Sequence, residues 1–453
     1  MKYPSSLLSL FAVAVITLLP GGMTHATTTA SNPKIVSDYT LSVYPDREAA
    51  IYKRGEQVEF QILVLGKEPT DEREVTWKIT KDGVPPIKEG KTKLKFGKAI
   101  VTANLDEPGF LTCDVSFNDG KQDLKATASA GIDPTEIKPS MPEPADFDAF
   151  WNAKKAELAA IPLNPKMTSV ETPADRPGVE TFDLQVDCLG KPVSGYYARP
   201  IGAKPGSCPA MLYVDGAGVR NSDKLAAIRP AGRGLIALAI NAHGIPNGQP
   251  AEFYTALDLG ELKNYRKEGS SSRDTCYFLG MYLRVKRALD FLTSQPEWDG
   301  KILVLNGGSQ GGGQAIAGAA LDPRVSLLVA MIPGMCDHTG MVAGRIAGWP
   351  KLVPLDAAGK PDPIVLGVAR YFDCVNFAPR IKAQTIYWIG FNDIITPPTS
   401  QFAAYNAIKA PKKLITAPEY GHGGEAPNFW PMIGDMIYNT VAEQQKKAQG
   451  QAH

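Results

Sequence analysis

A serine set between glycines is the group in this chain best suited to covalent chemistry. Ser309 stands in Gly-Gly-Ser-Gln-Gly at residues 307–311, directly after the apolar run 302–305. A strand that turns sharply into a helix at such a serine forms a nucleophile elbow, and the flanking glycines leave room for the turn. The pattern therefore predicts a hydroxyl that attacks carbonyl carbon. A plain glycine-rich turn is the alternative, because the chain has 43 glycines.

A serine hydroxyl needs a histidine that takes its proton and an acid that orients the imidazole. The chain has 5 histidines. His422 is the candidate base, because it lies in a glycine-containing loop between the apolar run 414–416 and a C-terminal helix. For His243 and His338 we expect a place in the wall of the cleft or in local hydrogen bonds.

Asp393 is the candidate acid. It follows the apolar run 385–389, and the carboxyl ends of strands in open α/β sheets collect catalytic groups. The order Ser309, Asp393, His422 is that of α/β-hydrolase triads. Asp373 is the main rival, but it lacks a strand directly before it, and a turn-forming role for Asp393 before two prolines is the other interpretation.

The loop Asp-Gly-Ala-Gly at residues 215–218 follows another apolar run, 211–214. Glycines there would let the backbone approach a substrate closely. We expect the N–H groups of Ala217 and Gln310 to form the oxyanion hole, with a plain turn at 215–218 as the alternative. The pattern leaves open whether Asp215 faces the cleft or turns away from it.

Short apolar runs alternate with helical segments such as 277–294 in the second part of the chain. The runs are 211–214, 235–240, 302–305, 326–331, 385–389 and 414–416. This alternation predicts a mostly parallel sheet with helices on both faces. With the serine elbow it indicates an α/β-hydrolase fold, which we place at residues 144–445.

Residues 35–135 have a different pattern, with short runs of period two separated by turns such as 82–83 and 108–109. The runs are 39–43, 58–64, 75–79, 99–103 and 110–117. They predict a small immunoglobulin-like β-sandwich. We expect it to act as a scaffold or an interface, and contact with carbohydrate is the alternative.

The proline-rich stretch 132–144 separates the two parts. After it, Asp146 is expected to cap a helix at 147–161. The aromatic residues Phe147, Phe150 and Trp151 of this helix recur at helical spacing and should pack on the catalytic body.

Composition excludes several classes of protein. The net charge of +1 in 453 residues argues against a nucleic-acid surface.

Residues 1–26, with an apolar core at 7–19, predict a signal peptide. The mature protein would then be periplasmic or extracellular, without a stable membrane span. Six cysteines allow several disulfide pairings or buried thiols, and their spacing suggests no metal site.

Several motifs resemble those of the acetyl xylan esterase and cephalosporin C deacetylase family of α/β-hydrolases. The resemblance covers residues 144 to about 438. It rests on Asp-Phe-Asp-Ala-Phe-Trp at 146–151, on 307–312, on Leu-Asp-Pro-Arg-Val at 321–325, and on the loops of Asp393 and His422. It implies removal of acetyl groups from small carbohydrates, with Ser309, Asp393 and His422 as the triad and the amides of Ala217 and Gln310 as the oxyanion hole.

The chain departs from the family pattern at two places. The family has His-Gly-Tyr where this sequence has Asp-Gly-Ala at 215–217, and Arg-Gly-Gln where it has His-Gly-Ile at 243–245. These changes alter the pocket wall, so the acyl specificity and the hexameric assembly of the family do not carry over directly. Whether the protein forms a homo-oligomer is left open by the sequence.

The sequence thus predicts a secreted serine esterase that deacetylates xylan or xylo-oligosaccharides and needs no cofactor or metal. Its partner would be an acetylated carbohydrate and not a nucleic acid. The alternatives are another ester hydrolase or a peptidase of the same fold, or a carbohydrate-binding module with an inactive hydrolase domain.

Overall fold

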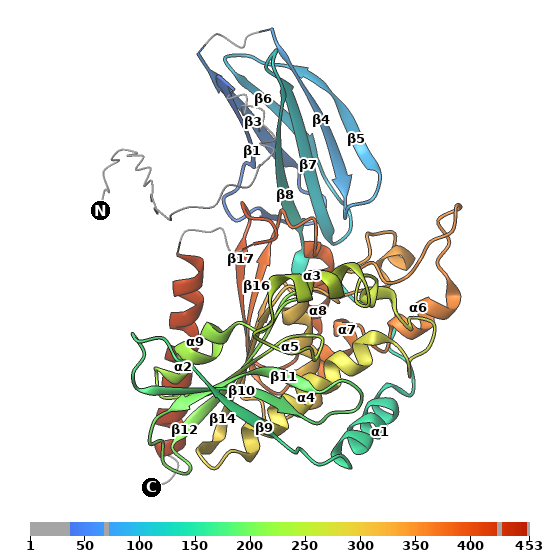
Figure 1. The fold of residues 1–453 in the computed structure, drawn as a ribbon. Coiled ribbons are helices and arrows are strands. Elements are labelled where there is room, and N and C mark those ends of the chain that lie inside the picture. Colours follow the sequence, from blue (N-terminus) through green and yellow to red (C-terminus); the bar gives the residue numbers. More distant parts are fainter. Residues whose placement is uncertain (1–36, 68–71, 424–427, 451–453) are drawn as a thin grey trace, which may run out of the picture.

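The chain folds into a strand-rich N-terminal unit stacked on a larger unit of strands and helices (Figure 1). The structure is a computed structural model that describes residues 37–67, 72–423 and 428–450. The predicted signal peptide at 1–26 lies outside the described residues. The predicted domain limits 35–135 and 144–445 stay predictions.

The N-terminal unit is a β-sandwich of two sheets. One sheet has the strand order β1 (Tyr39–Pro45), β3 (Val58–Gly66), β6 (Lys98–Ala103). The other has the order β2 (Ile51–Tyr52), β8 (Asp123–Ile132), β7 (Gly109–Asn118), β4 (Glu74–Lys81), β5 (Pro86–Lys93). Apolar side chains of both sheets, such as Phe60, Leu111 and Phe117, form one buried core between them.

The immunoglobulin-like sandwich was predicted correctly, but three of its strands were not. The five predicted runs lie in β1, β3, β4, β6 and β7. Strand β5 reads Pro-Ile-Lys-Glu-Gly-Lys-Thr-Lys and is mostly exposed, so it shows no apolar alternation. Strand β8 buries mainly alanines on its inner side, and β2 has only two residues.

The larger unit is built on a nine-stranded sheet. Its strand order is β17 (Lys412–Ala417), β16 (Gln384–Gly390), β15 (Leu327–Met331), β14 (Trp298–Gly308), β12 (Cys208–Val214), β13 (Ile236–Ile240), β11 (Val193–Pro200), β10 (Val179–Val186), β9 (Lys166–Val170). The strands from β17 to β13 are parallel, and β11, β10 and β9 add an antiparallel edge. All six predicted strand runs overlap the parallel part, which confirms the α/β prediction.

Helices cover both faces of this sheet. One face buries side chains of α1 (Phe147–Ala159), α4 (Tyr277–Ser294), α5 (Gln310–Leu321), α7 (Cys374–Phe377) and α8 (Pro398–Ala407). The other buries side chains of α2 (Lys224–Ala231) and α9 (Phe429–Gly450). Helices α3 (Ala251–Leu259) and α6 (Pro363–Ala369) lie nearer the surface. Among the described residues, no helix is both long and apolar enough to cross a membrane.

The helix expected at 147–161 forms as α1, and its aromatic residues are buried in the larger unit as predicted. Asp146 is the N-cap residue of this helix, as predicted, but its side chain makes no capping hydrogen bond. Its carboxylate instead accepts hydrogen bonds from Arg273 Nη1, at 2.6 Å, and from the Tyr371 hydroxyl. Two strong side-chain donors therefore outcompete the backbone N–H groups of the helix.

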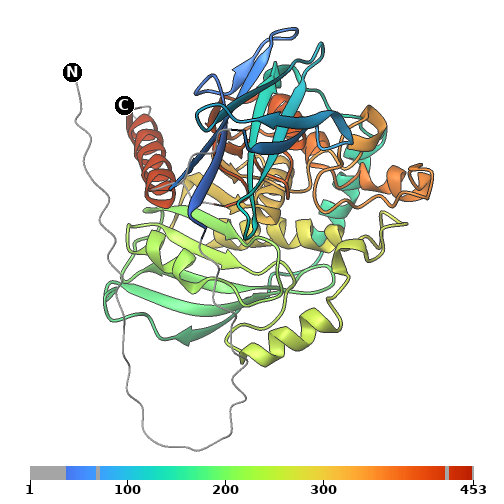
Figure 2. The same ribbon diagram turned by 90° about the horizontal axis from the view of Figure 1, so that it is seen from above.

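The sandwich contacts the larger unit at the carboxyl end of β16. Phe110 of β7 packs edge-on against Phe391, with ring centroids 5.1 Å apart, and also against Phe402. The buried carboxylate of Asp82, in the predicted turn after β4, accepts a hydrogen bond of 2.6 Å from the Thr399 hydroxyl. Seen from above, the blue sandwich strands lie over the orange and red C-terminal elements (Figure 2).

All six cysteines are buried and unpaired. They are Cys113, Cys188, Cys208, Cys276, Cys336 and Cys374. Of the two outcomes that the sequence left open, the structure has buried thiols. Burial raises the pKa of the Cys113 and Cys276 thiols to about 12, so both stay protonated at neutral pH.

Candidate active site

Ser309 occupies the turn between β14 and α5 with a strained backbone. Its φ of 57° and ψ of −124° lie outside the regions that residues with a side chain normally adopt. The end of the neighbouring strand holds this turn in place, because the Ser309 N–H donates to the Met331 carbonyl at 2.9 Å. The Ser309 carbonyl accepts from the Gly334 N–H at 2.8 Å.

The two glycines of the predicted elbow are needed for steric reasons. A Cβ at Gly307 would lie 2.4 Å from the Gly311 carbonyl oxygen. A Cβ at Gly311 would lie 2.2 Å from the carbonyl oxygen of Val214. Because the colliding atoms are backbone atoms of the sheet and the turn, neither contact can be relieved by moving a side chain. The serine turn therefore requires glycine at both positions.

Ser309, His422 and Asp393 lie together in the order that the sequence predicts. Ser309 Oγ is 2.9 Å from His422 Nε2, and His422 Nδ1 is 2.8 Å from Asp393 Oδ2. The loop after β16 carries the aspartate, and the loop after β17 carries the histidine. The imidazole can thus exchange a proton with the serine on one side and donate to the carboxylate on the other.

Backbone and side-chain donors fix the Asp393 carboxylate. Oδ1 accepts from the N–H groups of Ile395, at 2.9 Å, and Thr396, at 2.8 Å. The Thr396 hydroxyl donates to Oδ2 at 2.6 Å and lies 3.1 Å from His422 Nδ1. The carboxylate is fully buried. The sequence reasoning missed Thr396, although the spacing Asp-x-x-Thr is a signal for such a turn.

The loop at 215–218 lies beside the serine. A Cβ at Gly216 would be 3.7 Å from Ser309 Cβ, so the backbone of this loop passes close to the serine. The N–H groups of Ala217 and Gln310 donate no hydrogen bond to any described residue. Neither predicted oxyanion donor thus has a competing acceptor among the described residues.

The side chains of Arg220 and His243 contact backbone carbonyl oxygens of this loop. Arg220 Nη1 donates to the Ala217 carbonyl at 2.8 Å, and His243 Nε2 lies 3.2 Å from the Gly218 carbonyl. His243 is 1% exposed, and its Nδ1 is 2.7 Å from the Tyr277 hydroxyl. Burial, with a smaller effect from Arg284, lowers the pKa of His243 to about 4. His243 is thus neutral at neutral pH and makes local hydrogen bonds, one of the two roles expected for it.

The rival residues have other surroundings. The Asp373 carboxylate accepts the N–H groups of Asp337, at 2.7 Å, and His338, at 2.6 Å. Burial, followed by the charge of Asp337, raises the pKa of Asp373 to about 8. His338 is fully buried, and its ring stacks on Phe278. These residues belong to a buried network rather than to the serine site.

Asp215 is 6% exposed, and no described residue bonds to its Oδ2 atom. Burial raises the pKa of Asp215 to about 7, and the charge of Arg220 acts in the opposite direction.

Across the described ranges, no cluster of three or more His, Cys, Asp or Glu side chains is arranged to hold a metal ion.

The parallel sheet, the strained serine turn and the adjacent histidine and aspartate define an α/β-hydrolase. Comparison with known proteins narrows this class. Residues 134–430 match the family model of acetyl xylan esterase (AXE1). The acetyl esterase Axe7A of Xylanibacter ruminicola is 32% identical over 408 residues, which cover 88% of this chain and 90% of the relative. The chain therefore belongs to the acetyl xylan esterase family and is a carboxylic ester hydrolase.

Solved structures agree with this assignment. An acetyl xylan esterase from Paenibacillus sp. R4 is 29% identical, with a TM-score of 0.59 over 68% of this chain and 98% of its own. Acetyl xylan esterase 1 from Thermoanaerobacterium sp. JW/SL YS485 is 22% identical, with a TM-score of 0.56 over 69% of this chain and 97% of its own. The second likeness is one of fold alone.

Proposed function

We propose that this protein is an exported serine esterase that removes acetyl groups from acetylated xylan or xylo-oligosaccharides. The observation that carries the proposal is the contact of Ser309 Oγ with His422 Nε2 at 2.9 Å, with Asp393 behind the imidazole at 2.8 Å. Membership of the acetyl xylan esterase family supports an acetyl ester as the substrate.

In the proposed reaction, Ser309 Oγ attacks the acetyl carbonyl carbon while His422 takes the hydroxyl proton. The oxyanion of the tetrahedral intermediate binds to the N–H groups of Ala217 and Gln310. One such donor typically contributes about 2.7–4 kcal/mol to lowering the barrier. His422 then protonates the departing sugar oxygen, which leaves an acetyl-serine.

A water molecule completes the cycle. His422 takes a proton from this water, whose oxygen attacks the acetyl-serine carbonyl. The bond to Ser309 Oγ breaks, acetate leaves, and the serine regains its proton from His422. Asp393 accepts a hydrogen bond from His422 Nδ1 throughout and stabilises the imidazolium form.

The proposal of export rests on the sequence of residues 1–26. The apolar core at 7–19 is shorter than a membrane span, and small residues follow it. Acetylated xylan is a polymer outside cells, so the substrate and the proposed location agree.

An acyl-length series tests the activity. Purified residues 27–453 should hydrolyse p-nitrophenyl acetate in preference to the butyrate and octanoate esters. The Ser309→Ala variant, shown to be folded by circular dichroism, should have no turnover above background. Unchanged hydrolysis by that variant would refute the serine mechanism, and a preference for long acyl groups or for peptide substrates would refute deacetylation.

A further inference from the structure

The outer face of the five-stranded sheet in the sandwich is hollowed into a groove with a volume of about 640 Å³. Side chains alternate along each strand, so Val75 and Ile79 of β4 point into the sandwich core while Thr76 and Lys78 point outward. Groove side chains also come from β5, β7 and β8. The outward-facing side chains of the two rows described below are hydroxyl or charged groups, whereas Trp77 and Val115, which also line the groove, are packed against the sandwich core.

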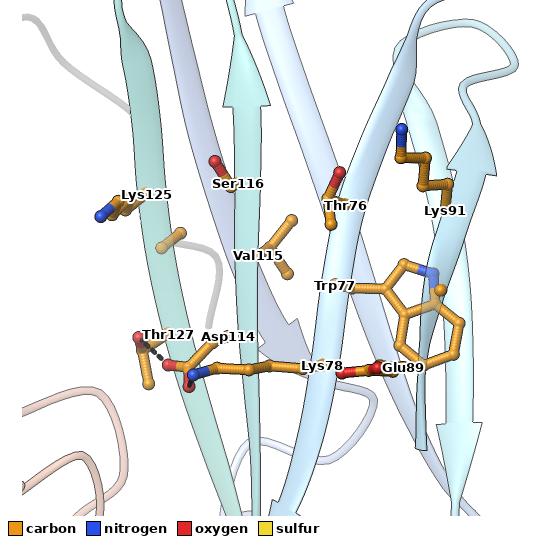
Figure 3. Close-up of a pocket in the computed structure, with 12 residues that line it drawn as sticks. Thr76, Trp77, Lys78, Glu89, Lys91, Asp114, Val115, Ser116, Lys125 and Thr127 are labelled. Carbon is orange, nitrogen blue, oxygen red and sulfur yellow. Dashed lines mark hydrogen bonds and ion pairs between the residues drawn. The ribbon is translucent and has the colours of Figure 1, made fainter. Parts of the chain in front are cut away.

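Strand pairing arranges these side chains in rows. In the first row, Thr76 lies opposite both Lys91 and Ser116, and Ser116 lies opposite Lys125. The second row contains Glu89, Lys78, Asp114 and Thr127 in the same strand order. Figure 3 shows both rows, with Lys125 and Lys91 at opposite ends of the first. Strands lie about 4.8 Å apart, so four strands give a row about 14 Å wide.

The two rows differ in how their charges are satisfied. Lys78 pairs with Asp114 at 3.6 Å, and Thr127 donates to the same carboxylate at 2.7 Å. In the first row, the side chains of Lys91, Thr76, Ser116 and Lys125 form no hydrogen bond or ion pair with any described residue. The first row therefore presents two free cations with hydroxyl groups between them.

The groove continues toward the candidate active site. A second hollow of about 240 Å³ shares Lys78, Asp114 and Thr127 with the first and extends to Ile394 and Pro397. These last two residues belong to the loop that carries Asp393. Ile394 is 75% exposed at this junction. A chain molecule lying along the strands would thus pass from the free lysines to the loop next to His422.

We propose that this groove binds an extended polysaccharide that bears carboxylate groups, namely a xylan with uronic acid substituents. The inference rests on the proposed function, because it supplies the polymer on which the esterase acts. The carboxylates pair with Lys91 and Lys125, and the sugar hydroxyls bond to the groups between them. The apolar surface of Ile394 contacts a sugar ring where the chain enters the catalytic unit.

Other partners fit the groove less well. A nucleic acid carries a phosphate on every nucleotide, whereas this groove offers only two unpaired lysines and also presents the carboxylate of Glu89. A protein partner would need an apolar centre, and the two rows offer hydroxyl and charged groups instead. A neutral polymer would leave both free lysines unpaired.

Steady-state kinetics of the full chain test the proposal with two matched polymers. One is an acetylated xylan that carries uronic acid, and the other is the same xylan after its carboxylates have been reduced to alcohols. The Lys91→Ala/Lys125→Ala variant should raise KM for the acidic xylan about tenfold, which corresponds to about 1.4 kcal/mol. KM for the reduced xylan and kcat/KM for p-nitrophenyl acetate should stay at the wild-type values.

The matched control is Lys95→Ala/Lys98→Ala, which removes two exposed lysines outside the groove, at the β5–β6 turn and the start of β6. It should keep the wild-type KM for the acidic xylan. An unchanged KM in the groove variant, or an equal rise in the control, would overturn the proposal. Affinity electrophoresis of Ser309→Ala in the acidic xylan, with and without the groove substitutions, tests binding even if the proposed chemistry fails.

Discussion

Asp393 has the surroundings that the proposed catalytic acid requires. Its Oδ2 atom faces His422, while two backbone N–H groups and a threonine hydroxyl hold it in place. Asp373 is equally buried, but it accepts only backbone N–H groups, two from the loop of Asp337 and His338 and one from Val375 in its own turn. The two buried aspartates thus differ in which atoms they face.

The Asp393→Asn variant tests this difference. An amide can present its NH₂ group to His422 Nδ1, which favours the wrong tautomer of the imidazole. We expect kcat on p-nitrophenyl acetate to fall by about 10⁴-fold. Asp373→Asn should lower the thermal unfolding midpoint but leave kcat near that of the wild type. If Asp373→Asn loses as much kcat as Asp393→Asn, the assignment of the acid is wrong.

Asp215 gives a prediction for the pH dependence of stability. Burial raises its pKa to about 7 in the folded chain, against about 3.9 in the unfolded chain. Between these values the folded state binds more protons, so this group lowers the free energy of unfolding as pH rises from about 4 to about 7. Asp215→Asn removes the titration and should be more stable than wild type at pH 8.

Urea unfolding of both proteins at pH 4 and pH 8 measures the effect. The advantage of the asparagine variant should be large at pH 8 and absent at pH 4. An advantage of equal size at both pH values would mean that Asp215 does not titrate in this range.

The proximity of Ser309, Asp393 and His422 could be predicted from the sequence, because a serine elbow, a strand-end aspartate and a late histidine follow one chain order. The residues that support them could not. Thr396 and Arg220 act through hydrogen bonds whose partners are set by loop geometry. For His243 the sequence indicated a place in the cleft wall or in local hydrogen bonds, but not its partners Gly218 and Tyr277, which depend on the tertiary fold.

At the scale of elements, the turn from β14 to α5 depends on close backbone approach. Gly311→Ala would place a Cβ 2.2 Å from the Val214 carbonyl oxygen. Because a shift of about 1 Å at a reacting group can cost about 10²-fold, we expect at least that loss in kcat. The thermal unfolding midpoint should also fall.

Gly367→Ala is the matched control, because a Cβ at this position in α6 meets no atom within 4 Å. Alanine there should leave kcat unchanged and add about 0.5–1 kcal/mol to stability. Equal kcat in the two alanine variants would show that the elbow tolerates a side chain.

The parallel strands and their helices were predictable, because buried apolar runs alternate with amphipathic segments. The antiparallel edge of β9, β10 and β11 was not predicted. Strand β9 is almost entirely exposed, so its sequence carries no apolar alternation. Such edge strands are defined by their partners more than by their own residues.

At the scale of the whole molecule, the sandwich supports the loop of Asp393. Phe110 is 1% exposed and packs against Phe391 and Phe402, which lie on either side of that loop in the sequence. Phe110→Ala should cost about 3–5 kcal/mol of stability. It should also lower kcat on p-nitrophenyl acetate, because the Asp393 loop loses its packing.

Phe117→Ala provides the comparison, since Phe117 is equally buried but lies in the core of the sandwich, beside Tyr39. It should destabilise the protein to a similar degree while kcat, measured at a temperature where both variants are folded, stays at the wild-type value. A similar kcat for the two variants would show that packing of the sandwich against the Asp393 loop does not affect catalysis.

This contact between the two units could not be predicted from the sequence. Asp82 was recognised as part of a turn, and Phe110 as part of a strand, but neither pattern identifies Thr399 or Phe391 as partners. Contacts between residues some 300 positions apart follow from how two folded surfaces meet, which local patterns do not encode.

The most direct test of the account is the identity of the acylated residue during turnover. The wild-type enzyme is mixed with p-nitrophenyl acetate, quenched in acid within the first turnover, digested and analysed by mass spectrometry. We predict an acetyl group on the peptide that contains Ser309, and none on that peptide from the His422→Ala variant. Turnover without an acetylated Ser309, or with the acetyl group on another residue, would contradict the proposed mechanism.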